Sequence, residues 1–161
     1  RRDIRRPCCF LRSFQPVVHF VQVIPSHDDW ERMRLGIDRV NAHSAPHLRQ
    51  TVEDVRAEFD KNHCTWCVIR DGEKIISDLV VKTLLEDTRR TLYVWLMFGE
   101  RLSKWARFAM QNLEQIAIFN GCDRIKFHTT RDKWIHLVQD VPDEWEHTHV
   151  FTKKVTYGRS I

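Results

Sequence analysis

The sequence is poor in the features that mark membrane, fibrous and disordered proteins. No run approaches the roughly 18 to 20 consecutive apolar residues that a membrane-spanning helix needs. Glycine and proline number only 5 each, too few for a collagen or a low-complexity chain. The 6 tryptophans and 9 phenylalanines require burial, which excludes wholesale disorder. The length of 161 residues therefore predicts one globular domain with a substantial core.

Cysteine is scarce and its count is odd. Five cysteines do not make a disulfide framework, which predicts reduced thiols and an intracellular protein. Cys64 and Cys67 have C-x-x-C spacing, and His43 and His47 upstream complete four potential zinc donors. Because Thr65–Ile69 has a strand pattern, residues three apart there point to opposite faces. We therefore expect two buried thiols and no metal.

Positive charge is concentrated at the N-terminus. The formal net charge is +4, and residues 16–161 contain equal numbers of acidic and basic side chains. The whole excess therefore lies in an arm, residues 1–15, that precedes a single domain over residues 16–161. Such an arm can bind nucleic-acid phosphates or an acidic protein surface, and a solvated tail is the alternative. Its basic residues are Arg1, Arg2, Arg5, Arg6 and Arg12.

Hydrophobic periodicity and turn residues predict a mixed α/β (α+β) domain in the order β-α-α-β-β-β-α-β-α-β. Ser26 with Asp29, and Thr51 with Asp54, have the spacing of capping boxes. The expected elements are strand Val17–Ile24, a helix from Ser26 through Val40, a helix from Thr51 through Phe59, strands Thr65–Arg70, Lys74–Leu85 and Thr91–Phe98, helix Lys104–Phe119, strand Arg124–His128, helix Arg131–Val138 and strand Glu146–Tyr157.

The middle of the chain gives the clearest signals. Asp71-Gly72 predicts a hairpin between two strands, and the polar run 86–90 predicts a second turn. Thr91–Phe98 is apolar on both faces, so we expect it to be central and covered on both sides. Ser103 is expected to cap the long helix, and Gly121 to follow its C-terminal end. The parallel neighbour of the central strand is then expected to be Arg124–His128.

This order resembles the GNAT fold of the acyl-CoA N-acyltransferases over Val17–Tyr157. Thr65–Phe98 and Gly99–His128 carry most of the resemblance. Within the family the chain is most similar to short, divergent GNAT-like proteins of tailed bacteriophages, some of which travel in the virion. Small size, tryptophan richness and the junction Leu96–Gln115 favour that subgroup. The resemblance implies a mixed sheet with helices on both faces, acetyl-CoA as a substrate, and a location in the host cytoplasm or the virion.

The resemblance also implies where CoA would bind. In the family the CoA pyrophosphate lies at the N-terminus of the helix after the fourth strand, where free N–H groups and the helix dipole favour an anion. The family loop has glycines that let the backbone approach the phosphates, but here only one glycine is present. Glu100 and Trp105 add a negative charge and bulk. The alternatives are an ordinary helix start and a degenerate cofactor site made of Phe98, Gly99, Arg101, Ser103 and Lys104.

Candidate catalytic groups are few. The family often uses a Glu on or near the fourth strand and a Tyr on the helix after the fifth, but Thr91–Phe98 has no carboxylate and Arg131–Val138 has no tyrosine. The resemblance leaves His128, at the end of the fifth strand, for proton transfer and Tyr93 as a hydrogen-bond donor, unless they are a surface and a core residue. His147 and His149 would share one strand face, and we expect them to be exposed.

Two functions from different classes follow. The first is an N-acetyltransferase that transfers an acetyl group from acetyl-CoA to an amine. The second is a catalytically inactive GNAT-fold structural or interaction protein of a phage virion, with protein partners in the virion or the host. A third, weaker function is nucleic-acid contact through the basic arm. Neutral charge over residues 16–161 argues against a broad nucleic-acid face.

Overall fold

A computed structural model describes residues 18–100 and 102–128 of the chain. Several predictions concern residues outside this description. They are the basic arm, Arg101, the expected helix Arg131–Val138, and the expected strand Glu146–Tyr157 with His147 and His149. In chain order the described elements are β1 (Val18–Gln22), α1 (His27–Asn41), the 3₁₀ turn η1 (Pro46–Leu48), α2 (Val52–Asp60), β2 (Thr65–Asp71), β3 (Lys74–Glu86), β4 (Arg89–Gly99), α3 (Leu102–Phe119) and β5 (Arg124–Phe127).

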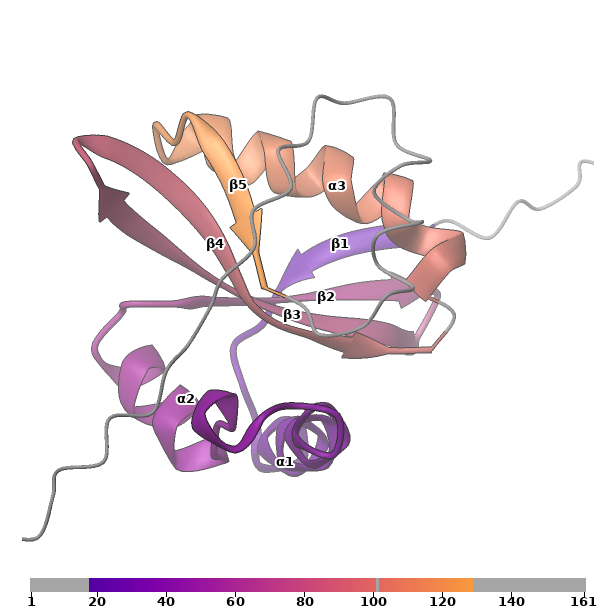
Figure 1. Ribbon diagram of the computed structural model, residues 1–161. Coiled ribbons are helices and arrows are strands. Elements are labelled where there is room, and N and C mark those ends of the chain that lie inside the picture. Colours follow the sequence, from indigo (N-terminus) through magenta and orange to yellow (C-terminus); the bar gives the residue numbers. More distant parts are fainter. Residues whose placement is uncertain (1–17, 101, 129–161) are drawn as a thin grey trace, which may run out of the picture. The chain divides into compact units, whose positions relative to one another are not determined.

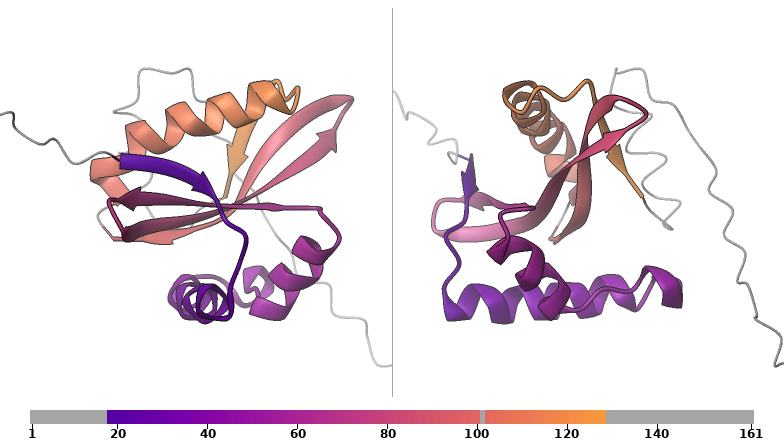
Figure 2. Two further views of the ribbon diagram at one scale, coloured as in Figure 1. Left: turned by 180° about the vertical axis from the view of Figure 1, so that it is seen from behind. Right: turned by 90° about the vertical axis from the view of Figure 1, so that its left-hand side faces the viewer.

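The five strands form one mixed sheet in the order β1-β2-β3-β4-β5 (Figure 1). Neighbours from β1 to β4 are antiparallel, and β5 is parallel to β4. The parallel pair joined by α3 and the Asp71-Gly72 hairpin are confirmed. Burial on both sides of β4 is confirmed as well, because α1 and α3 contact it from opposite faces of the sheet (Figures 1 and 2).

One face of the sheet, called here the α1–α2 face, is covered by the first two helices. Both helices begin with the expected capping boxes: the Ser26 and Thr51 side chains accept from the third helical N–H, and Asp29 and Asp54 accept in return. These bonds pair N–H groups that a helix start leaves without partners. The buried residues of this core are Met33, Ile37, Val55, Cys64, Trp66, Val68, Val80, Leu96 and Phe98.

The other face, called here the α3 face, packs against the long helix. Its buried residues are Ile69, Ile76, Leu79, Val81, Leu92, Val94, Ala109, Leu113 and Ala117. The helix ends as expected: Gly121 has φ +63°, its N–H donates to Ile118, and the Cys122 N–H donates to Ala117, which is a Schellman motif. Its start differs from the expectation. The helix begins at Leu102, so Ser103 lies in the first turn and not at the cap.

The turn between β3 and β4 is tighter than the polar run 86–90 predicts. Only Asp87 and Thr88 connect the strands, with φ of 47° and 71°. Two central residues with positive φ make a turn whose twist matches that of the flanking strands. The hairpin therefore continues through Glu86 and Arg89, and both strands are longer than expected.

The thiols of Cys64 and Cys67 are buried and form no disulfide. Cys64 belongs to the core of the α1–α2 face, together with Trp66 and Val68. Cys67 lies between these two residues in β2, so its side chain points to the α3 face. Burial raises the pKa of each thiol to about 11, with Lys82 and Glu58 adding opposing effects at Cys64. Within residues 18–100 and 102–128, no three His, Cys, Asp or Glu side chains gather as a metal site.

No helix in the described part of the chain combines the length and the apolarity that crossing a membrane requires.

Candidate functional site

The site begins where the pairing of β4 with β5 ends. The two strands pair over only four positions, from Thr91–Arg124 to Val94–Phe127. β4 then continues to Gly99, and no other described strand pairs with residues 95–99 on the β5 side. β4 therefore runs past the end of β5, and we call the region beside this unpaired edge of β4, residues 95–99, the wedge (Figure 1).

A β-bulge lies at the start of the wedge. Val81 pairs with Val94 and the preceding Val80 pairs with Leu96, so Trp95 is an extra residue in β4. The bulge changes which residues face which helices. Leu92 and Val94 pack on the α3 face before it, whereas Leu96 and Phe98 pack on the α1–α2 face after it. Trp95 packs against the α1–α2 core as well.

The end of β4 is held closely against β3 and α1. The Phe98 ring lies so near Gly36 of α1 that a Cβ there would be 2.1 Å from its Cε2 atom. Gly99 has φ +155°, and a Cβ at this residue would lie 2.3 Å from the Ile76 carbonyl oxygen. Glycine is therefore required at both positions. The Glu100 N–H donates to the same Ile76 carbonyl at 2.9 Å, which fixes the strand end.

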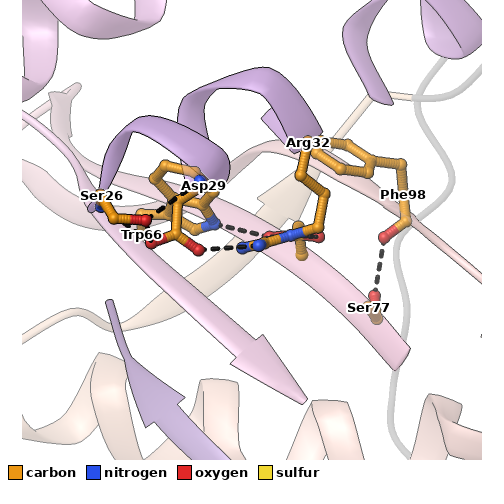
Figure 3. A network of polar contacts seen from close by, with 7 residues as sticks. Ser26, Asp29, Arg32, Trp66, Ser77 and Phe98 are labelled. Atoms are coloured by element: carbon orange, nitrogen blue, oxygen red, sulfur yellow. Dashed lines mark hydrogen bonds and ion pairs between the residues drawn. The ribbon is translucent and has the colours of Figure 1, made fainter. Parts of the chain in front are cut away.

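A polar network anchors α1 beside this end of β4 (Figure 3). The buried Asp78 carboxylate accepts from the Arg32 guanidinium at 3.0 Å and from the Trp66 indole N–H at 2.9 Å. Arg32 also binds Asp29 at 2.7 Å, which links the network to the capping box. Ser77 donates to the Phe98 carbonyl oxygen at 3.0 Å. These bonds satisfy buried polar groups next to the wedge.

The structure brings together the two residues predicted for catalysis. Tyr93 lies on β4 and His128 follows β5, and their ring centroids are 5.5 Å apart in an edge-to-face arrangement. Tyr93 is partly buried and His128 is exposed. Burial raises the pKa of the Tyr93 phenol, and the negative charge of Glu86 raises it further. The phenol is therefore a proton donor at neutral pH.

Charged residues surround Tyr93 on the same face of the sheet. Its register partners are Lys82 on β3 and Lys126 on β5. The Lys82 Nζ atom lies 3.3 Å from the centroid of the Trp95 ring and 3.3 Å from Glu58 Oε2 on α2. This contact attaches the bulged residue to α2. Sequence reasoning missed these residues, because the pairs Glu58–Lys82 and Lys126–Glu86 are far apart in the chain.

The fold is similar to that of solved acetyltransferases. The complex of AAC(6')-Iy with the bisubstrate analogue CoA-S-monomethyl-acetylneamine has a TM-score of 0.65 and 12% identity, over 87% of this chain and 99% of that chain. The aminoglycoside acetyltransferase meta-AAC0020, from an uncultured soil metagenomic sample and in complex with sisomicin, has a TM-score of 0.60 and 12% identity, over 87% of this chain and 97% of that chain. A predicted acetyltransferase from Clostridium acetobutylicum with acetyl-CoA has a TM-score of 0.59 and 12% identity, over 83% of this chain and 96% of that chain.

The chain has the GNAT fold. The fold class expected from the sequence is therefore confirmed. No protein-family model matches the sequence, and no curated protein matches it. The similarity to solved structures is a similarity of fold, and the site has to be argued from this chain's own residues.

The residues predicted to hold CoA gather at the GNAT helix start, as far as the structure describes them. Phe98 and Gly99 end β4, and Lys104 lies in the first turn of α3, where its Nζ atom is 4.7 Å from the centroid of the Trp105 ring. Arg101 and the Ser103 side chain lie outside the description. The Lys74 Nζ atom binds the Glu100 carboxylate at 2.8 Å. A cation on β3 thus offsets the acidic residue of the loop.

Proposed function

We propose that the protein is an acetyl-CoA-dependent N-acetyltransferase that acts on a primary amine. The observation that carries the proposal is the unpaired edge of β4 at the wedge, which begins at the Trp95 bulge. Strand edges without a partner strand present backbone N–H groups, and a bulge redirects them. Fixed N–H groups of this kind stabilise an oxygen on which negative charge develops during acyl transfer.

The start of α3 fits the phosphates of CoA. The first N–H groups of a helix have no intrahelical partner, and the helix dipole favours an anion there. Lys104 adds a positive charge, and Lys74 compensates Glu100. Phe98 and Gly99 would position the backbone of the adjacent loop, and Arg101 and Ser103 would add a charge and a hydroxyl. When bound, acetyl-CoA supplies a thioester carbonyl that a neutral amine attacks directly.

Tyr93 and His128 are proposed to move the protons of the reaction. Imidazoles ordinarily exchange protons near neutral pH, so His128 suits removal of the proton from the attacking amine. The Tyr93 phenol stays protonated because its pKa is raised, and it suits donation to the departing thiolate. Tyr93→Phe and His128→Gln should each lower kcat roughly 100-fold with little change in KM.

The proposal is tested by calorimetric titration with acetyl-CoA and by measuring thiol release in the presence of amines. We expect weak binding, with Kd on the order of millimolar, because the loop has one glycine. Glu100→Gln should tighten binding, and the double variant Arg101→Ala, Lys104→Ala should abolish it. Arg34→Gln, on the exposed side of α1, is the matched control. If acetyl-CoA does not bind, the alternative function as a non-catalytic interaction protein of a phage particle replaces this one.

A further inference from the structure

We propose that the acceptor amine of this chain carries an anionic group, a carboxylate or a phosphate, near the nitrogen that is acetylated. This inference rests on the proposed acetyltransfer and adds the chemical class of the acceptor. It comes from the charges that surround Tyr93 on the α1–α2 face. We call Lys82, Arg124 and Lys126 the basic patch.

The register of the sheet places the basic patch around the proposed reaction centre. Lys82, Tyr93 and Lys126 are cross-strand partners, so a lysine lies next to Tyr93 on each neighbouring strand. Arg124 lies two residues before Lys126 on β5, and its Nε atom donates to the Thr91 hydroxyl at 2.9 Å. His128 lies two residues after Lys126, which places it on the same face.

The carboxylates nearest to the patch are already bound by cations. Glu86 binds Lys126 at 2.9 Å and Arg124 at 3.7 Å. Hydrogen bonding and charge from Lys126, with smaller effects of Thr91 and Arg124, outweigh burial and lower the pKa of Glu86. The side chain is therefore negatively charged at neutral pH and compensates two cations at once.

The same holds on the α2 side. Glu58 binds Lys82 at 3.3 Å and Lys61 at 3.8 Å. The preceding turn of α2 carries Asp54, which accepts from the Thr51 N–H and hydroxyl, both at 2.8 Å. Lys82 is therefore faced by two carboxylates, Glu58 and Asp54, whereas Lys126 and Arg124 share the single carboxylate of Glu86, so the excess of positive charge lies on the β5 side of Tyr93.

This charge balance discriminates between acceptors. A polycation would place its additional ammonium groups next to Lys126 and Arg124, whose side chains are 37% and 41% exposed. An anionic group would instead accept hydrogen bonds from the same side chains and complement the excess positive charge. Aminoglycosides are polycations, so the acceptor class inferred here differs from sisomicin, the ligand of a solved neighbour.

The experiment compares four small amines of matched size in the acetyl-CoA-dependent thiol-release assay. Propylamine has no second charge, β-alanine adds a carboxylate, O-phosphoethanolamine adds a phosphate, and 1,3-diaminopropane adds a second ammonium. The expected kcat/KM for one or both anionic amines exceeds that of propylamine by about threefold to tenfold, as exposed ion pairs allow. The carboxylate and phosphate arms show which anion is preferred. Diaminopropane is expected to fall below propylamine.

Variants of the patch separate charge from folding. Lys126→Gln should remove most of the anion preference, and Lys126→Glu should reverse it, while Arg34→Gln should leave the order of the four amines unchanged. Circular dichroism and the melting temperature verify that each variant is folded. Equal rates for the four amines, a preference for diaminopropane, or turnover of propylamine without turnover of either anionic amine would overturn this inference alone. Failure to bind acetyl-CoA would overturn the proposed function together with it.

Discussion

From Thr91 to Val94, β4 is hydrogen-bonded between β3 and β5, whereas from Trp95 to Gly99 it pairs with β3 alone among the described strands. The first half lies in a continuous sheet whose apolar side chains pack under α3. The second half is held by α1 and by the Asp78 network, and its other edge borders the wedge. Both halves of β4 are apolar, but the first half lies inside the paired sheet, whereas the second half leaves one edge without a described partner strand.

The comparison shows that the position of one residue divides the strand. Trp95 interrupts the alternation of side chains, so apolar residues on either side of it serve opposite cores. A regular strand of the same residues would present Leu96 and Phe98 to α3. The bulge therefore satisfies the packing of both faces, and it lies at the position where the pairing with β5 ends.

Inserting one alanine between Val80 and Val81 should produce the largest effect. The insertion gives Trp95 a partner in β3 and restores regular alternation, so Leu96 and Phe98 turn away from α1, which costs more than about 5 kcal/mol, comparable to a whole domain's stability. We expect loss of the cooperative unfolding transition in urea. The control, Trp95→Ala, keeps the bulge and should remain folded, at a cost of about 1–2 kcal/mol. A folded insertion variant with an unchanged transition would show that the bulge is dispensable.

Gly36→Ala should disturb the second half selectively. The added methyl group collides with the Phe98 ring, which costs roughly 3 kcal/mol, and Phe98→Leu in the same chain should recover part of the loss. Leu92→Ala, in the first half, should cost a similar roughly 3 kcal/mol through a cavity. Measured well below the melting temperature, acetyl-CoA binding should weaken in Gly36→Ala and persist in Leu92→Ala. Equal weakening of acetyl-CoA binding in both variants would show that the two halves of β4 do not differ in their effect on the site.

The two faces of the sheet can be compared through their buried thiols, Cys64 on the α1–α2 face and Cys67 on the α3 face. Cys64 and Cys67 have pKa values of about 11 in the folded protein, above the ordinary value of 9.0. The folded state therefore holds these protons to higher pH, so their stabilising contribution is full below pH 9 and is lost as pH rises toward 11. Cys64→Ala and Cys67→Ala should each flatten part of the alkaline decline in urea stability. An unchanged slope in both variants would contradict this assignment.

Thr88→Gly should give the smallest change, and in the opposite direction. Thr88 is β-branched and has φ +71°, a conformation that suits glycine. The substitution should stabilise the protein by about 0.5–1 kcal/mol in urea unfolding. Because the turn connects the first half of β4, acetyl-CoA affinity should not change. A destabilised variant would indicate that Thr88 makes compensating contacts.

Local signals in the sequence predicted the elements well. Capping boxes at Ser26 and Thr51, the Asp71-Gly72 hairpin and the doubly apolar run Thr91–Phe98 all depend on residues close in the chain, and all are confirmed. The polar run 86–90 marked the second turn but not which two residues form it. Several residues of that run are compatible with a turn, and strand twist selects among them.

The candidate site was less predictable. Val94, Trp95 and Leu96 are all apolar, so no alternation of polar and apolar residues is present there to indicate a bulge. The contacts of Lys82 with Glu58 and of Lys126 with Glu86 depend on strand register and on helix docking, neither of which follows from residue spacing. The sequence did single out Tyr93 and His128, but only the parallel pairing of β4 with β5 places their rings in contact.

The two tight hairpins that join β2, β3 and β4 have a consequence for the order of folding. Their pairings are local along the chain, so little loop entropy opposes them and this three-stranded meander should form early. The β1–β2 and β4–β5 pairings must each close a longer segment that contains helices, and should follow. The nucleus would then contain the bulge from the start, and the wedge would appear only when β5 arrives, as the last step to shape the site.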